Sequence, residues 1–210
     1  MKPKFAVSAI LLLMTASLAQ TGTAQQAEDL YQGTVVTRQE TQDSITYTLK
    51  EDLSFSGFRT EDTVFAGSVF FNQLADHTRP ASESVMTFTG TGMSMSFDDC
   101  SSIHSDRWVN DNEGGGAIRG ETLTFTDMGD LSFNNCKSIV NADTNAGGAV
   151  NARGDITFSH MGNISFTNNM LGDDSQQGQA LGGALFTWGK IDFENTKSIL
   201  FSGNSTGHSP

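Results

Sequence analysis

An internal repeat of about 35 residues constrains the fold of this chain more than any other feature of its sequence. The middle copy spans residues 147–169 and reads GGAVNARGDITFSHMGNISFTNN, and related copies begin at Gly115 and Gly182. A further copy, at residues 86–100, keeps the second half of the pattern without the pair of glycines. Repeats with periods of about 20 to 50 residues are typical of stacked architectures, in which each unit packs on its neighbours. The sequence therefore predicts a stack of similar units.

Each unit has the pattern of short β-strands. In the middle copy Ile156 and Phe158, and then Ile164 and Phe166, alternate with Thr or Ser, and residues 147–150 provide a third short run. Alternation over short runs separated by Gly, Asp or Asn predicts strands with one buried face. Three such strands predict one coil of a three-sided, right-handed parallel β-helix. We therefore expect an all-β fold with about four coils of 32 to 37 residues and an N-terminal cap.

Two sets of phenylalanines recur once per unit. The chain has 15 Phe against two Tyr and two Trp, which suits a core made of rings without polar groups. Equivalent residues in a parallel stack lie about 4.8 Å apart, so each set is expected to form a column of rings. The first set is Phe88, Phe125, Phe158 and Phe193, and the second is Phe97, Phe133, Phe166 and Phe201.

Two other positions recur with the rings. Three residues after each ring of the second set stands Cys100, Cys136, Asn169 or Asn204. An Asn at such a corner is expected to hydrogen-bond to the backbone and to stack on its neighbours. The glycine pairs are expected at the opposite corner, where a side chain would clash or φ must be positive.

The N-terminal 24 residues have the pattern of a secretory signal. Lys2 and Lys4 precede an apolar run at residues 5–18, and the small residues that follow allow cleavage after Ala19 or Ala24. The alternative is a transmembrane anchor, which needs about 20 apolar residues, more than this run provides. We predict residues 1–24 to be the signal.

The exported part is expected to contain two segments. Residues 25–85 are interpreted as an N-terminal cap with a degenerate coil, because the stretch 52–58, DLSFSGF, echoes the repeat and an atypical end unit protects a sheet edge. Residues 86–210 carry the repeats. Without the signal, 10 basic residues face 24 acidic ones, giving a net charge of −14. This charge argues against nucleic acid and anionic lipid as partners.

The two cysteines occupy the same repeat position, 36 residues apart. One coil apart in a parallel stack, the Cα atoms of Cys100 and Cys136 would lie within the roughly 4.4 to 6.8 Å that a disulfide requires, and export is an oxidising route. They are therefore a candidate disulfide. Two reduced thiols and links to other chains remain as alternatives.

Few residues are candidates for chemistry. The close carboxylate pairs are Asp98 with Asp99 and Asp173 with Asp174, whereas acid–base catalysis needs two carboxylates that converge on one groove. The metal patterns CxxC and HxxxH are absent. We predict no catalytic residues, no metal and no cofactor, and keep a β-helical carbohydrate-active enzyme as the alternative. The histidines, which share no repeat position, are His77, His104, His160 and His208.

The alternation of GGA and an aliphatic residue with FxxN resembles the chlamydial polymorphic membrane proteins, a family of outer-membrane autotransporters. The resemblance covers about residues 86–204, and its interleaved copies are more specific than either motif alone. Two copies depart from it by having Cys in place of Asn. The GGA copies are Gly115, Gly116, Ala117 and Ile118; Gly147, Gly148, Ala149 and Val150; and Gly182, Gly183, Ala184 and Leu185. The full FxxN copies are Phe166 with Asn169 and Phe201 with Asn204.

This resemblance implies a non-enzymatic, surface-exposed or secreted adhesin that serves in antigenic display and virulence. The implied partners are a host cell-surface protein, further copies of the chain and other family members. The family's translocating β-barrel has no counterpart in the 210 residues, so we expect a passenger fragment that is peripheral to the outer membrane. Retention in the periplasm and a nonfunctional remnant of a truncated gene remain as alternatives.

Overall fold

The computed structural model describes residues 35–41, 43–61, 69–71, 84–104, 115–140, 144–172 and 179–207. In this part the chain forms strands and no helix, and the strands assemble into predominantly parallel sheets. The all-β class predicted from the alternation is therefore confirmed for the described part. The predicted signal lies outside the described residues, as do Asp173, Asp174, His77 and His208.

The strands form five sheets, here called A to E. Sheet A contains β1 (Val36–Glu40), β2 (Ser44–Leu49), β6 (Val85–Thr89), β10 (Thr122–Thr126), β15 (Ile156–Ser159) and β20 (Ile191–Glu194). Sheet B contains β3 (Leu53–Ser56), β7 (Met95–Asp98), β11 (Leu131–Asn134), β16 (Asn163–Thr167) and β21 (Ser198–Ser202). Sheet C contains β4 (Arg59–Glu61), β8 (Ser101–His104), β12 (Lys137–Val140), β17 (Met170–Leu171) and β22 (Ser205–Thr206). Sheet D contains β5 (Phe70–Phe71), β9 (Ile118–Gly120), β14 (Val150–Ala152) and β19 (Leu185–Thr187), and sheet E contains β13 (Thr144–Ala146) and β18 (Gln179–Leu181).

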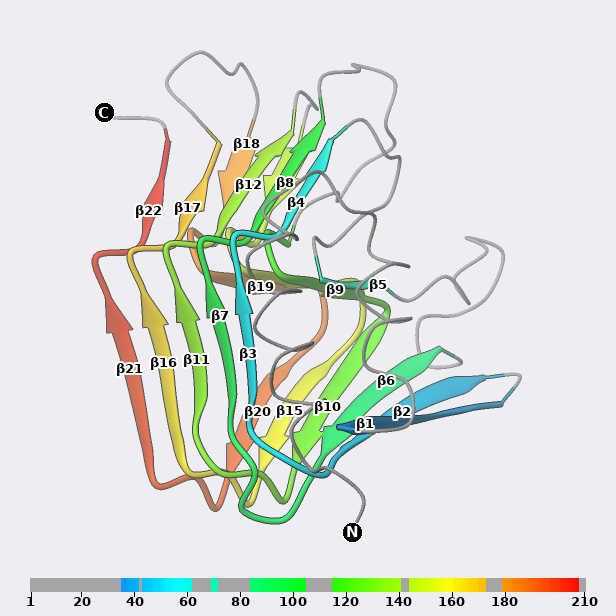
Figure 1. The fold of residues 1–210 in the computed structure, drawn as a ribbon. Coiled ribbons are helices and arrows are strands. Elements are labelled where there is room, and N and C mark those ends of the chain that lie inside the picture. The colour runs from blue at the N-terminus through cyan, green and yellow to red at the C-terminus, as the bar shows by residue number, and fades with distance from the viewer. Residues whose placement is uncertain are drawn as a thin grey trace, which may run out of the picture.

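Neighbouring strands in each sheet come from successive repeats. The chain passes from sheet A to B and then to C, and it returns to A after one repeat, so that the colours in Figure 1 run in order across each sheet. Among the described strands, β1 and β2 pair antiparallel and the other pairs are parallel. Each repeat therefore packs mainly on the repeats before and after it.

The prediction of three strands per repeat was wrong. The repeat that starts at Gly147 contributes β14, β15 and β16, as expected, but β17 of sheet C follows, and β18 of sheet E lies beyond it. The strands of sheet C are short, and the residues that β8 and β12 share, Ser102 with Ser138 and Ile103 with Ile139, do not recur in β17 or β22. Their conformation is fixed by hydrogen bonds to the repeat above and below, which a pattern within one repeat does not reveal.

Both predicted columns of rings are confirmed. Phe125 pairs with Phe158 in sheet A, and Phe133 pairs with Phe166 in sheet B. Ring centroids from Phe88 to Phe193 and from Phe97 to Phe201 are 4.8 to 5.0 Å apart, and the ring planes are within 9° of parallel. The ring spacing matches the spacing of the paired strands, so each ring stacks on the equivalent ring of the next repeat.

The first repeat extends both columns and places an additional ring between them. Tyr47 stacks on Phe88, and Phe55 stacks on Phe97. Phe70 of β5 lies edge-on to Tyr47, Phe55 and Phe88, with centroids 4.9 to 5.3 Å away. This repeat is longer than the 32 to 37 residues expected, since Phe70 pairs with a residue 48 positions later, Ile118.

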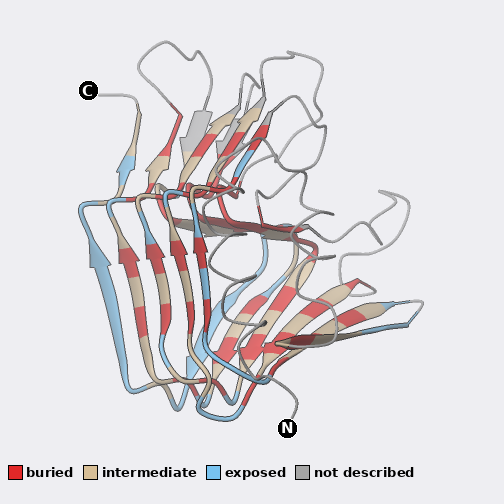
Figure 2. Ribbon diagram, viewed as in Figure 1, coloured by how far each residue is buried: buried red, intermediate tan, exposed pale blue. Residues whose placement is uncertain are grey.

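The two ends of the stack differ in exposure. Figure 2 shows buried positions alternating along β2 and β3 in the first repeat, whereas β20 and β21 of the last repeat are exposed along their lengths. Within the ring columns, Phe55 is fully buried, while Phe193 is 36% and Phe201 is 50% exposed.

Candidate functional site

The first glycine of each GGA copy has a left-handed backbone. Gly115, Gly147 and Gly182 have φ of +98°, +69° and +71°. This region is costly for residues with a Cβ atom and freely accessible to glycine. A positive φ at the glycine pair was predicted, and the structure confirms it for the first member.

The second glycine leaves no room for a side chain. A Cβ on Gly148 would lie 2.0 Å from the carbonyl oxygen of Gly183 in the next repeat and 2.7 Å from the carbonyl carbon of Met170. The clash predicted for the pair is therefore confirmed. These contacts are with backbone atoms, which cannot rotate away as a flexible side chain can.

The two motifs meet within each turn of the chain. The second glycine, Gly148 or Gly183, packs against the backbone of the residue that directly follows FxxN, which is Met170 or Ser205. The glycine pair therefore lies against the corner that ends FxxN, and its predicted position at the opposite corner was wrong. The spacing between GGA and FxxN is thus fixed by a direct backbone contact.

The Asn of FxxN joins consecutive repeats. The side-chain amide of Asn169 donates a 3.1 Å hydrogen bond to the carbonyl oxygen of Phe133, and its Oδ1 accepts the N–H of Cys136 at 2.9 Å. Asn204 makes the same pair of bonds one repeat later, to Phe166 and to the N–H of Asn169. The predicted bonding of this Asn to the backbone is confirmed.

Replacing Asn169 with Ala is expected to lower the free energy of unfolding by about 1 to 3 kcal/mol. The substitution removes the only described hydrogen-bond partner of the buried Cys136 N–H, and an unpaired buried donor costs about that much. Chemical denaturation measures the change. Asn168→Gly is the control, since this neighbouring side chain is exposed and its φ of +54° is freely accessible to glycine; an equal loss of stability in both variants would contradict the role of Asn169.

The two cysteines take the place of Asn in this column. The thiol of Cys136 donates to the carbonyl oxygen of Phe97 at 3.8 Å, and that of Cys100 donates to Phe55 at 3.9 Å. Both are free and buried, so the structure does not contain the predicted disulfide. Hydrogen bonding with the Cys100 thiol, together with burial, raises the pKa of Cys136, which keeps it a neutral donor. In each repeat, the Cys or Asn side chain at this position therefore donates a hydrogen bond to a backbone carbonyl oxygen of the preceding repeat.

Most of the motif residues are inaccessible to a partner. The copies at residues 115–118 and 147–150 are buried, and so are Phe166 and Asn169. The last copies differ because Phe201 is half exposed and lines an open hollow of about 330 Å³ with Gly183, Ala184, Leu185, Ser202, Gly203 and Asn204. The buried copies therefore act by holding the stack together.

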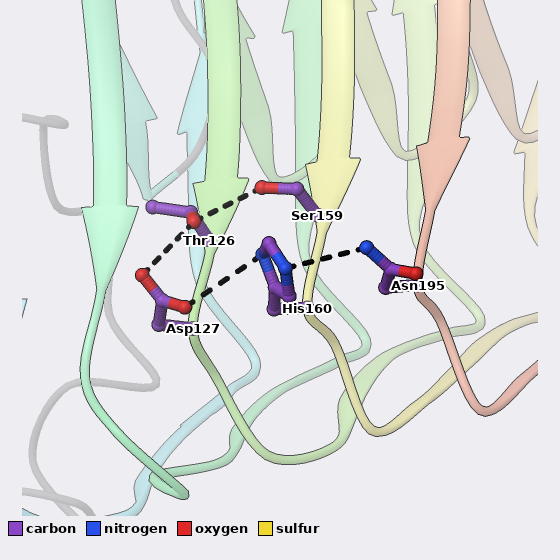
Figure 3. A network of polar contacts seen from close by, with 5 residues as sticks. All are labelled: Thr126, Asp127, Ser159, His160 and Asn195. Atoms are coloured by element: carbon purple, nitrogen blue, oxygen red, sulfur yellow. Dashed lines mark hydrogen bonds and ion pairs between the residues drawn. The ribbon is translucent and has the colours of Figure 1, made fainter.

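A polar column follows the corner between sheets A and B, as Figure 3 shows. Asp127, His160 and Asn195 each come directly after a strand of sheet A, with φ between 50° and 54°. His160 Nδ1 lies 3.8 Å from Asp127 Oδ1, and His160 Nε2 lies 3.3 Å from the side-chain amide of Asn195. The Ser159 hydroxyl donates to Thr126 (Figure 3), and neither it nor Thr126 bonds to His160. The column is an exposed corner ladder and lacks the serine-to-histidine bond of a nucleophilic triad.

Asp98 and Asp99 are likewise engaged by the next repeat. Asn134 donates to Asp98 Oδ1 at 2.6 Å, and Asn135 donates to Asp99 Oδ1. Among the described residues, no group of three His, Cys, Asp or Glu side chains is placed to hold a metal ion. Within the same described ranges, the structure has no helix of the length and apolar character that a membrane span requires.

The fold lowers the pKa of the carboxyl group of Asp130. The cause is chiefly the backbone N–H of Asn163, which donates to Oδ1 at 2.7 Å, together with the side-chain amide of Asn163. A folded-state pKa below the unfolded value of about 3.9 adds stability above that value, and this stability is lost as the pH falls through the folded pKa. We expect Asp130→Asn to unfold at lower urea concentration than wild type at pH 7 and at nearly the same concentration at pH 2. The effect should be small because Asp130 is exposed, and equal midpoint shifts at both pH values would contradict it.

Sequence comparison and structural comparison leave the family open. The chain matches no protein-family model, no curated protein and no solved structure. Its function must therefore be argued from the repeat geometry described above.

Proposed function

We propose that this chain is a right-handed parallel β-helix that serves as an adhesin-like passenger of an outer-membrane autotransporter. The observation that carries the proposal is the contact between each second glycine and the residue after FxxN. Because that contact fixes both motifs in one turn, their interleaving is a property of the coil. The resemblance to the chlamydial polymorphic membrane proteins then concerns a whole coil architecture and is more informative than two short motifs.

The sheet topology supports the coil assignment. Strands one repeat apart pair in parallel in sheets A, B and C, which requires the chain to return to the same side at each turn. Crossovers between parallel strands are right-handed in about 98% of cases, and we propose that hand here. Stacks of this kind are extended and present long side faces for recognition.

The predicted export signal and acidic exported chain favour display at the cell surface or secretion. The net charge of −14 after the predicted cleavage disfavours binding to anionic lipid or nucleic acid and leaves a host surface component or further copies as partners. The carboxylates of Asp98 and Asp99 accept hydrogen bonds from Asn134 and Asn135 of the next repeat, which is a structural role, and we propose binding without turnover.

Saturable binding of the exported chain, from residue 25 onward, to cultured epithelial cells is the test. We expect labelled protein to bind with a plateau and to be displaced by unlabelled protein, while heat-denatured protein binds without a plateau. Light scattering of the same sample measures self-association. A folded protein that binds no cell surface saturably would contradict the adhesin proposal.

A further inference from the structure

The outer face of sheet B changes from polar to apolar at the last repeat. One outward column reads Ser54, Ser96, Ser132, Ser165 and then Leu200. Leu200 is 53% exposed, and its neighbours Ile199 and Phe201 are exposed as well. An outward side chain adds nothing to the core of its own coil, so the leucine is not explained by the stack. A contiguous exposed apolar surface of this kind is typical of a contact site.

The strand that carries Leu200 is an unprotected edge. Figure 1 shows β21 as the outermost strand of sheet B, and Figure 2 shows it exposed along its length. Its sequence, SILFS, contains no charged residue and no proline. Proteins usually protect sheet edges with charges, proline or very short strands, because a bare edge pairs with any available strand. The edge of sheet B is therefore suited to pairing.

The neighbouring edges are protected. In β20, at the edge of sheet A, Asp192 pairs with Thr157 and Glu194 pairs with Ser159, so two acids point outward where the previous repeat has hydroxyl groups. Like charges placed opposite each other would destabilise the pairing of two β20 strands. In sheet C, β22 is only two residues long and carries hydroxyl side chains. Sheet B is therefore the sheet whose edge favours an apolar partner strand.

The opposite end of the stack does not offer a matching open face. Tyr47 and Phe55, the rings of the first repeat, are buried, whereas Phe193 and Phe201 of the last repeat are 36% and 50% exposed. In sheet A, β1 also covers the edge of the first repeat by antiparallel pairing. Head-to-tail stacking of copies needs open faces at both ends, whereas a two-fold contact uses one face twice. The difference between the ends therefore favours a closed dimer.

We propose that two copies of this chain associate tail to tail through antiparallel pairing of their β21 strands. Ile199 and Phe201 lie in the core columns of sheet B and Leu200 lies outside, so a continuous core requires inward residues to face inward residues. A two-fold axis at Leu200 meets this requirement and pairs all five residues of the strand. The two Leu200 side chains then contact each other on the outer face.

The same register also covers the open hollow beside β21. It places Lys197 of one copy opposite Gly203 of the other, and Gly203 lines the hollow together with Phe201 and Asn204. The exposed apolar strand and the hollow next to it are thus both covered by one contact. This inference goes beyond the proposed function, because it concerns assembly and holds whether or not the chain binds cells.

Sedimentation equilibrium of the exported chain, from residue 25 onward, tests the dimer. We expect a monomer–dimer equilibrium without larger species, and a dissociation constant at least about tenfold weaker for Leu200→Ser. This variant restores the residue that the other repeats carry in the column. Asp192→Thr is the matched control on the edge of sheet A and should dimerise at least as well as wild type. Circular dichroism spectra of both variants should match that of wild type.

A chain that stays monomeric at about 100 μM, where even a Kd of about 10 μM would give mostly dimer, would overturn the inference. Equal dimerisation of Leu200→Ser and wild type would overturn it too, and so would chains of many copies, which require head-to-tail contacts. Cell binding by a chain that fails to dimerise would leave the adhesin proposal standing.

Cross-linking tests the position of the two-fold axis. Residues directly opposite in an antiparallel pair have Cα atoms about 4.5 to 5.5 Å apart, within the range that a disulfide spans. Mild oxidation with copper phenanthroline should therefore link Leu200→Cys into a covalent dimer in high yield. Ser132→Cys, in the same column but on an interior strand, should stay monomeric in a denaturing gel. Equal cross-linking of the two variants would contradict pairing at Leu200.

Discussion

Phe166→Ala is expected to lower the free energy of unfolding by about 3 to 5 kcal/mol. Phe166 is fully buried, and its ring stacks between Phe133 and Phe201 with centroids 4.9 Å away on both sides. The backbone hydrogen bonds of sheet B keep β11, β16 and β21 at the strand spacing, so the cavity left by the ring cannot close. Urea or guanidinium unfolding, followed by far-ultraviolet circular dichroism, measures the loss.

The same motif supplies a matched comparison for this variant. Phe201 occupies the equivalent place in the last FxxN copy but is 50% exposed, so Phe201→Ala is expected to cost less than about 2 kcal/mol. If both variants lose equal stability, the ring column is not a cooperative core. If Phe201→Ala keeps its stability and loses cell binding, the exposed copy of the motif contacts the receptor directly. Binding losses in Phe166→Ala should instead follow its unfolding.

Gly148→Ala is expected to destabilise the chain by about 3 kcal/mol or more. The added methyl group would lie 2.0 Å from the carbonyl oxygen of Gly183 and 2.7 Å from the carbonyl carbon of Met170, so two repeats must separate to admit it. Since Gly148 is not among the residues with positive φ, the cost arises from lack of space and not from backbone conformation. Thermal and chemical denaturation both report it.

Gly57→Ala separates the two reasons for which a glycine is needed. Gly57 has a φ of +69°, and a Cβ there would meet no atom within 4 Å. Its replacement should therefore cost only the left-handed backbone term of about 1 to 2 kcal/mol. A Gly148→Ala variant that is no less stable than Gly57→Ala would contradict the close contact between the glycine pair and the corner.

The ring columns and the Asn bonds could be predicted because residue identity repeats at those positions. Phe125 and Phe158 are both phenylalanine and are paired in the sheet, so the role of the ring in one repeat predicts its role in the next. The later strands of sheet C, β17 and β22, could not be predicted in this way. Met170–Leu171 and Lys137–Val140 pair in parallel although their sequences share no pattern, because pairing in a sheet depends on backbone groups that every residue carries.

The corner columns were missed for a related reason. Asp127, His160 and Asn195 differ in charge and size, so the sequence comparison of repeats gave no common position for the histidine. The shared property is a left-handed backbone, with φ near +50°, which Asn, Asp and His adopt more readily than most residues. A search for residues of this group directly after each predicted strand would have found the column.

The position of the Cys and Asn column was predicted correctly, but the bonding of the two cysteines was not. A shared position suggested that Cys100 and Cys136 bond to each other, whereas each thiol points to the carbonyl of the preceding repeat as Asn169 does. The contact between the glycine pair and the residue after FxxN was also missed. It joins Gly148 to Met170 and Gly183 to Ser205, each 22 positions later, and the second partner is a different residue in the two repeats.

The side chains of the Asn column all reach toward the preceding repeat. Asn169 donates to the carbonyl oxygen of Phe133 and accepts the N–H of Cys136, and Asn204 bonds in the same way to Phe166 and Asn169. The backbone groups at each of these corners are therefore satisfied by the repeat that follows them. Loss of one repeat would leave polar backbone groups unpaired in the repeat before it, so the stability of each repeat depends on its successor.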